Sequence, residues 1–120
     1  MSEQPKLRVV FFRTDTENEP AREWLRGLDK TDKQRIGVDI EKVRFRWPVS
    51  MPLVRKLEPD LWEIRSNLPK KRIARVLFTL EDNEMVLLHG FIKKTQRTPQ
   101  RDLRLARKRK DTWKTENPVA

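Results

Sequence analysis

The side chains that could carry out chemistry in this sequence are mostly cations. The chain contains one histidine, His89, and neither cysteine nor tyrosine. These absences exclude disulfides, a cysteine nucleophile and a zinc site built from several imidazoles. Glu63 and His89 remain as candidates for catalytic acid–base groups. Each also has a structural interpretation, because Glu63 suits a cross-strand partner for an arginine, and His89 lies in an apolar segment where a hydrogen-bonded core histidine is more common.

Two arginines occupy alternate positions in neighbouring segments that have the pattern of strands. Arg65 lies in 61–66, where Trp62 and Ile64 fall on the other face, and Arg75 lies in 72–80. Because successive side chains of a strand point to opposite faces, both arginines can point from the sheet toward one concavity. The forked guanidinium suits two oxygens of one phosphate. The pattern therefore allows a phosphate clamp made by Arg65 and Arg75, and the alternative for each is a surface cation that supports solubility.

The charge balance favours a polyanionic partner. The formal net charge is +10, and ten of the 28 basic residues but only two of the 18 acidic residues lie in 93–114. Clustered Lys and Arg bind phosphate chains by releasing condensed counterions. A charge run is usually a solvated helix face, but the density of this one favours a phosphate-contacting surface. No apolar run approaches the roughly 18 residues of a membrane span, so nucleic acid is preferred over a membrane.

The first half of the chain predicts one strand and two helices. The β-branched and aromatic run 7–13 is typical of a strand. A short amphipathic helix is expected from Pro20, with apolar residues at a spacing of three and four. A second helix is expected to begin with a capping box at 31–34 and to end before Pro48. The short connection between the two helices predicts an antiparallel helical hairpin.

The second half predicts a sheet and a third helix. Strands are expected over 53–57, 61–66, 72–80 and 85–92, and their short turns predict an antiparallel meander. Thr98 followed by Pro99 predicts the N-cap of a last helix with a thin apolar stripe. The expected order is β-α-α-β-β-β-β-α, an α+β domain with its helices on one face of a curled antiparallel sheet. A length of 120 residues fits one domain, 1–115, followed by a short C-terminal tail, 116–120.

Several stretches resemble one family. MPLVRKLEPDLWEIRS, RIARVLFT and VLLHGFIKKTQRTPQRDLRLARKRK are similar, in order and spacing, to the HigB-type, phage-derived branch of the RelE/ParE toxin superfamily. EPAREWLRGL matches as well, so the resemblance covers nearly the whole chain. The run 87–99 is its most specific part, followed by 61–63. The resemblance implies a RelE-like fold, in which a curled sheet with an N-terminal helical hairpin and a C-terminal helix presents a concave basic face.

The resemblance also implies a function. It implies the toxin of a type II toxin–antitoxin system, an endoribonuclease that cuts messenger RNA on the ribosome and so inhibits translation. The implied partners are a cognate helix-turn-helix antitoxin, the ribosome and mRNA, with the toxin monomeric alone and hetero-oligomeric with its antitoxin. We expect no metal and no cofactor. Residues 1–6 are polar and do not begin a secretory signal, so a cytoplasmic protein is expected.

The positions that match the family pattern are Arg65, Arg75, Lys94 and Arg97. Lys94, or Lys93 beside it, is a candidate general base if neighbouring cations lower its pKa, and Arg97 could neutralise charge on the leaving side. The lack of tyrosine departs from the family, whose members often use one. Trp62 could stack on a base, although a core position is more common for such a residue. The wider set expected to contact RNA or the ribosome is Arg55, Lys56, Trp62, Arg72, Lys93, Arg101, Arg104, Arg107 and Lys108.

Two other functions stay open at this stage. The ParE branch shares the fold and inhibits DNA gyrase without catalysis, so the fold alone does not decide between the two activities. A basic nucleic-acid-binding module without catalysis is the second alternative, favoured by the missing tyrosine and the single histidine. Convergent cations on a sheet face favour RNA cleavage over gyrase inhibition, because an inhibitor needs no such cluster.

Overall fold

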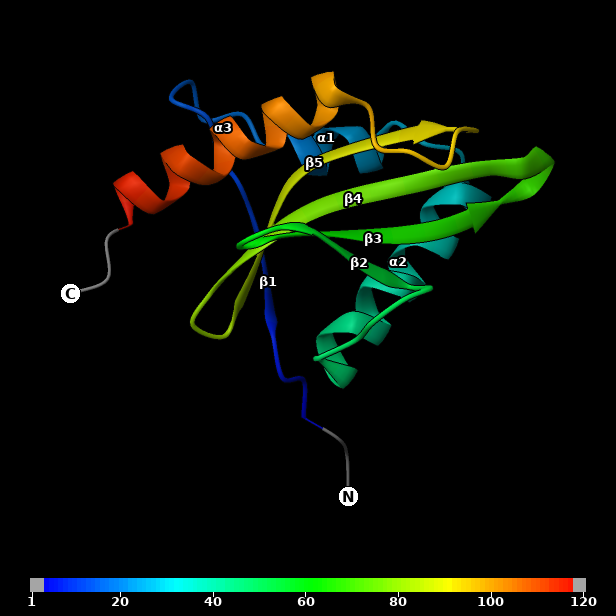
Figure 1. Ribbon diagram of the computed structural model, residues 1–120, viewed down its shortest axis with the longest axis horizontal. Coiled ribbons are helices and arrows are strands. Elements are labelled where there is room, and N and C mark those ends of the chain that lie inside the picture. Colours follow the sequence, from blue (N-terminus) through cyan, green and yellow to red (C-terminus); the bar gives the residue numbers. More distant parts are fainter. Residues whose placement is uncertain (1–3, 118–120) are drawn as a thin grey trace.

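Residues 4–117 are described by the computed structural model, and they form a five-stranded sheet with three α-helices (Figure 1). The elements in chain order are β1 (Arg8–Phe11), α1 (Pro20–Arg26), α2 (Lys30–Arg46), β2 (Val54–Glu58), β3 (Leu61–Leu68), the 3-10 turn η1 (Pro69–Lys71), β4 (Arg72–Glu81), β5 (Glu84–Lys93) and α3 (Gln100–Glu116). The predicted α+β class is confirmed. Within the predicted tail 116–120, Glu116 still belongs to α3, and residues 118–120 lie outside the described residues.

The sheet is mixed rather than wholly antiparallel. Its strand order is β1-β5-β4-β3-β2, and the pairs from β2 to β5 are antiparallel, as the short turns predicted. The antiparallel prediction is wrong for β1, which pairs parallel with β5, with Val9 opposite Met85. Two helices separate β1 from β2, so the chain crosses the sheet before β2 begins. Short turns between neighbouring strands carry no information about such a distant pairing.

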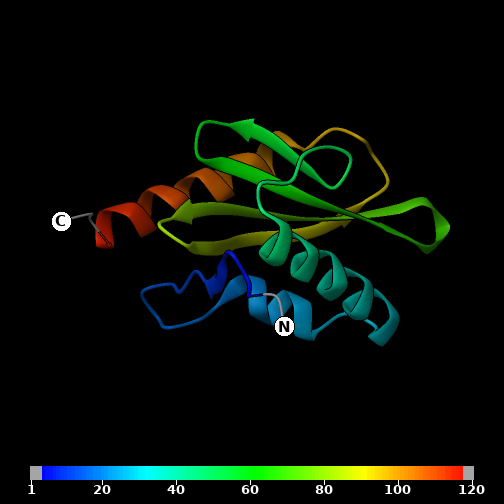
Figure 2. The ribbon, with the colours of Figure 1, turned by 90° about the horizontal axis from the view of Figure 1, so that it is seen from below.

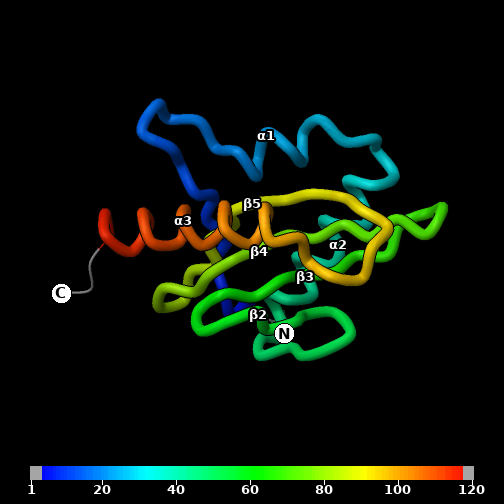
Figure 3. Tube along the Cα trace, turned by 45° about the horizontal axis from the view of Figure 1, so that its top comes forward, coloured from blue at the N-terminus to red at the C-terminus, as the bar shows by residue number. Residues whose placement is uncertain are grey.

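The helices cover both faces of the sheet. On one face α1 and α2 pack on a core that includes Ile36, Ile64 and Phe78. On the other face α3 packs against β4 and β5, where Leu77, Leu88 and Ala106 are buried together. Figures 2 and 3 show α1 and α2 on one side of the sheet and α3 along the other. The prediction that all helices lie on one face is therefore wrong, because alternate residues of β4 and β5 are apolar on both faces.

The starts of α2 and α3 differ from the predicted caps. Helix α2 begins at Lys30 after Asp29, and no side-chain cap hydrogen bond is present. The capping box at 31–34 is therefore wrong. Asp32 instead accepts two hydrogen bonds from the Arg72 guanidinium, at 2.8 and 3.0 Å. Thr98 does not cap α3 either, because its hydroxyl donates to Glu63. Thr31 already lies inside α2 and cannot be its N-cap, whereas at Thr98 a tertiary partner takes the hydroxyl that a local cap would have used.

The two N-terminal helices contact the sheet more than each other. Helix α1 packs on β5 and α2 on β3. Trp24 of α1 lies directly over Gly90 of β5, where an added Cβ would be 2.2 Å from the indole ring. Glycine is needed at this position because helix and strand approach so closely. Within residues 4–117, no helix combines the length and apolar character that a membrane crossing needs.

Candidate nucleic-acid interface

The predicted pair Arg65 and Arg75 lies on the α3 side of the sheet. Their Cα atoms are direct partners across β3 and β4. Two like charges in this position repel each other, and a carboxylate is placed to offset the repulsion. Oε1 of Glu63 is 3.7 Å from Nη1 of Arg65 and 3.9 Å from Nε of Arg75. The prediction that Glu63 pairs with an arginine is confirmed, with two arginines sharing one carboxylate oxygen.

Arg75 is the innermost member of this group. Its side chain is fully buried, and its guanidinium donates hydrogen bonds to the backbone carbonyls of Lys93, at 3.4 Å, and of Thr95. Burial lowers the pKa of Arg75, while the nearby Glu63 partly offsets that effect. A guanidinium in this position does not reach the surface. Its present contacts hold the segment that follows β5 against the sheet.

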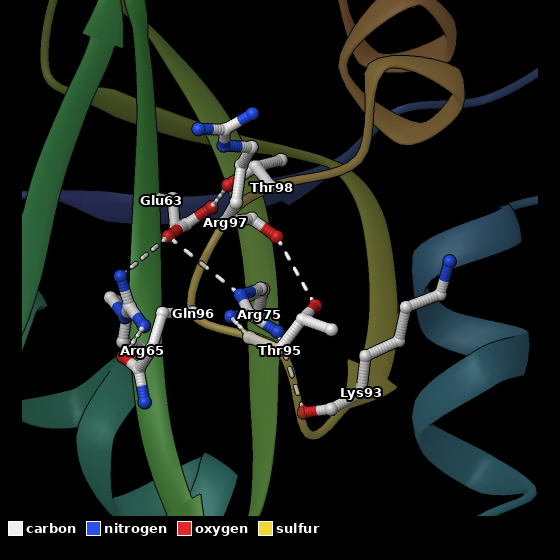
Figure 4. A network of polar contacts seen from close by, with 8 residues as sticks. All are labelled: Glu63, Arg65, Arg75, Lys93, Thr95, Gln96, Arg97 and Thr98. Carbon is white, nitrogen blue, oxygen red and sulfur yellow. Dashed lines mark hydrogen bonds and ion pairs between the residues drawn. The ribbon is translucent and has the colours of Figure 1, made fainter.

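The segment 93–98 is tied to the sheet by two further contacts (Figure 4). Thr98 donates its hydroxyl to Glu63, and Nη2 of Arg65 donates to Oε1 of Gln96 at 2.9 Å. Within the segment, Thr95 donates its hydroxyl to the carbonyl of Arg97 at 3.4 Å. We name this set of residues, Glu63, Arg65, Arg75, Gln96 and Thr98, the arginine cluster. The sequence analysis found its three strand members but missed Gln96 and Thr98, which belong to an irregular segment without periodicity.

His89 lies in a separate polar group beneath α3. Its Nε2 is 2.7 Å from Oδ1 of Asp102, and its Nδ1 is 3.4 Å from Nη1 of Arg109. Burial lowers the pKa of His89, opposed in part by Asp102. A neutral imidazole that donates from Nε2 to Asp102 and accepts at Nδ1 from Arg109 fits both contacts. His89 is hydrogen-bonded, as its structural interpretation expected, and nothing in the sequence indicated that Asp102 and Arg109 are its partners.

Five of the predicted cations form an exposed surface that begins next to the arginine cluster and extends along α3. They lie on the β5–α3 connection and on the outer side of α3, and none has an ion-pair partner among residues 4–117. They are Lys94, Arg97, Arg101, Arg104 and Lys108. We name this set the cationic track. Arg101, Arg104 and Lys108 are spaced by three and four residues, which places them on one side of the helix. Figure 4 shows the Arg97 side chain pointing away from the buried cluster.

The other predicted contact residues are distributed more widely. Arg55 is exposed and faces the same side as Glu63, its partner in register. Lys56 and Trp62 lie on the opposite side, where the indole packs against Trp47 and Phe78 in the core beneath α2. The structure therefore places Trp62 in the core, the position that is common for such a residue, and away from the cationic track.

Three predicted cations are engaged in ion pairs. Arg72 binds Asp32, and Arg107 donates two hydrogen bonds to Glu58 at 2.9 and 2.8 Å. These contacts lower the pKa of Asp32 and of Glu58. Lys93 is half-exposed, with Nζ 3.6 Å from Oδ2 of Asp102. These three cations are less available to a ligand than the five of the cationic track.

The surface is suited to a chain of phosphates. Its cations are exposed, follow one another over a loop and a helix, and are supported by a buried network that fixes the loop. Within residues 4–117, no three His, Cys, Asp or Glu side chains group together as a metal site would require. Electrostatic contact with an extended polyanion is the interaction that such an arrangement offers.

The fold and this surface define a small basic α+β protein with a cationic helix on one face of its sheet. The family model described as "Phage derived protein Gp49-like (DUF891)" matches residues 23–111, more than half of the chain. The chain therefore belongs to the Gp49-like family of phage-derived proteins, which is a RelE/HigB-like toxin family. A search of curated proteins finds no match to this chain.

Proposed function

We propose that this protein is the toxin of a type II toxin–antitoxin system and cleaves messenger RNA on the ribosome. The observation that carries the proposal is the cationic track, which begins beside the arginine cluster in a member of a toxin family. Ion-paired surface cations support folding, whereas exposed cations without carboxylate partners remain able to bind phosphates. Their concentration on one side favours a nucleic-acid substrate over a general role in solubility.

The proposed chemistry is attack of a ribose 2′-hydroxyl on the adjacent phosphate. This reaction needs removal of the hydroxyl proton, protonation of the leaving 5′ oxygen and stabilisation of charge on phosphorus. Lys94 and Arg97 are the exposed candidates for proton transfer and charge stabilisation respectively. Arg65 and Arg75 act in this proposal as positioning residues, since their contacts fix the backbone from which Lys94 and Arg97 extend. His89 has a structural role beneath α3.

The partners follow from the same proposal. A growth-arresting nuclease requires an antitoxin, which we propose to be a helix-turn-helix protein that forms a hetero-oligomer with an otherwise monomeric toxin. The site of action is then the cytoplasm, where ribosomes and mRNA meet. A ribosome also offers ribosomal RNA to the outer side of α3, so Arg104 and Lys108 are proposed contacts for that RNA.

The experiment is primer extension on a defined mRNA incubated with the purified protein, with and without programmed ribosomes. We expect discrete cuts only in the presence of ribosomes. In the Lys94→Ala/Arg97→Ala variant the cuts should weaken by at least about 100-fold, because one lost group that stabilises transition-state charge costs about 10²–10³ in rate. The melting temperature of this variant should stay close to that of the parent, because both side chains are exposed.

The matched control removes two cations from the other face of the molecule. Arg26→Ala/Arg46→Ala changes exposed residues of α1 and α2 and lowers the net charge by the same amount. It should cleave as the parent does. An equal loss of mRNA cleavage in both double variants would attribute the effect to net charge alone. Intact mRNA in every reaction would argue for a gyrase inhibitor or a binding module instead.

A further inference from the structure

A hollow of about 350 Å³ lies at the end of the sheet, beside the arginine cluster. It is formed where the turn between β3 and β4 meets the connection after β5, and its lining includes Asn67, Lys71, Ile73, Lys94 and Gln96. Its size is at the lower end of the range for small-molecule sites. No carboxylate lines it, so the groups that face it are amides, cations and apolar carbons. This combination suits a nucleotide, which has a flat apolar face, polar edges and an anionic phosphate.

The hollow continues the face that carries the arginine cluster. Asn67 is opposite Ile73 across β3 and β4, and Ile73 is opposite Lys93 across β4 and β5. Asn67 lies two residues beyond Arg65, so both point to the same side of the sheet. Ile73 is nearly buried and provides an apolar floor. A strand of RNA along the cationic track could therefore continue into the hollow without crossing the sheet.

The amide of Gln96 has a defined orientation. Its Oε1 accepts a hydrogen bond from Arg65, whose guanidinium is held by Glu63 (Figure 4). With its oxygen engaged, the amide has its NH₂ group left to donate. The side chain of Asn67 is exposed and makes no hydrogen bond to another of residues 4–117, so it can both donate and accept. Such amides can read the polar edges of an unpaired base.

Two lysines stand at the rim of the hollow. Lys94 belongs to the cationic track, and Lys71 belongs to η1, which closes the turn between β3 and β4. Lys70 and Lys71 have φ values of 64° and 61°, a region that residues other than glycine rarely occupy. Backbone in this region persists where the surrounding structure holds it, and it concentrates at ligand sites. Here it sets the direction in which the chain presents Lys71.

We propose that this hollow is a base-reading subsite for one nucleotide of a single-stranded RNA. The base lies against Ile73, the Gln96 amide donates to an acceptor on its edge, Asn67 contacts a second edge group, and Lys71 and Lys94 contact the flanking phosphates. This inference rests on the proposed function and deepens it, because it assigns sequence preference to Ile73, Asn67 and Gln96, which have no part in the proposed proton transfer. The arginine cluster then has a second role, which is to orient the reading amide.

The test measures binding without cleavage, using the whole chain. Hexaribonucleotides that differ only in one central base, and the four 5′-nucleoside monophosphates, are titrated while the side-chain amide signals of Asn67 and Gln96 are followed by NMR. We expect those signals to shift, with dissociation constants for the hexamers that differ by about tenfold or more between best and worst base, as one good amide–base contact gives. In Gln96→Ala that ratio should fall to within about twofold.

The matched control is Gln34→Ala, which removes an exposed amide from α2 and should keep the base preference. Unchanged preference in both Gln96→Ala and Asn67→Ala would overturn the subsite, as would shifts confined to other residues. Tight binding of a free monophosphate, equal to that of the hexamer, would assign the hollow to a small nucleotide and not to RNA. Because the readout needs no cleavage, base-selective binding by an inactive protein would refute the nuclease and retain the subsite. Cleavage with cut sites that do not change in Gln96→Ala would support the nuclease and refute the subsite.

Discussion

Glu63→Gln is the substitution that tests the arginine cluster most directly. The parent carboxylate is fully buried, within 4 Å of both guanidiniums and bound by the Thr98 hydroxyl. Glutamine keeps the shape but removes the charge, which leaves Arg75 buried beside Arg65 with no carboxylate of residues 4–117 within 4 Å. Removing one partner of a buried ion pair costs about 3–5 kcal/mol. At about 4 °C per kcal/mol for a domain of this size, the melting temperature should fall by about 12–20 °C.

The assay is urea unfolding followed by tryptophan fluorescence, which the four tryptophans of the chain permit. The dependence of the unfolding free energy on urea should stay constant, because the surface exposed on unfolding does not change. Glu41→Gln is the control, since Glu41 forms an exposed pair with Arg44 at 2.9 Å. Such exposed pairs contribute about 0–1 kcal/mol. The two variants should therefore differ by at least about 2 kcal/mol.

A second substitution separates the lost charge from lost packing. Arg75→Met in the Glu63→Gln background removes the unpaired guanidinium while keeping a long apolar side chain in its place. If uncompensated charge is the cause, the double variant should recover at least half of the lost free energy of unfolding, because a buried pair replaced by apolar groups is often neutral. Two results would refute this reasoning. One is a loss of unfolding free energy below about 1 kcal/mol in Glu63→Gln, and the other is a double variant in which the effects of the two substitutions simply add.

Three further predictions concern other parts of the molecule. Burial holds the pKa of His89 below its value of about 6.5 in an unfolded chain, so the unfolded state binds the proton first as the pH falls. The free energy of unfolding should therefore fall as the pH drops through about 6.5. The dependence of the urea midpoint on pH should be flatter in His89→Gln. Gly90→Ala should cost about 1–3 kcal/mol by overpacking against Trp24, and an unchanged urea midpoint would contradict that contact. Arg104→Ala/Lys108→Ala should make the salt dependence of single-stranded RNA binding shallower by about 1.4 in log–log slope, and an unchanged slope would remove both from the interface.

Alternation within strands was enough to predict which faces of the sheet carry which residues. It placed Arg65 and Arg75 on one face and favoured the core for Trp62, and both assignments agree with the structure. It could not give the depth at which each arginine lies. Arg75 is fully buried because the segment after β5 folds over it, and that segment has no periodicity from which its path could be predicted. The parallel pairing of β1 with β5 was missed for a related reason, since it joins strands from opposite halves of the chain.

The concentration of positive charge on one side has a structural explanation. Three carboxylates of the α3 side are engaged by inward or sideways cations: Glu63 by Arg65 and Arg75, Glu58 by Arg107, and Asp102 by Lys93. These three carboxylates help to fix α3 and its connection to the sheet.

The cations that point outward are consequently left without neutralising partners in the described part of the chain. The internal pairs thus have two effects. They hold the β5–α3 connection and α3 in place, and they leave the cationic track charged. A variant that loses an internal carboxylate should therefore lose RNA binding through disorder of the loop, even though its net charge becomes more positive. A lower RNA affinity at a more positive net charge would show that binding depends on the arrangement of the cations and not on net charge alone.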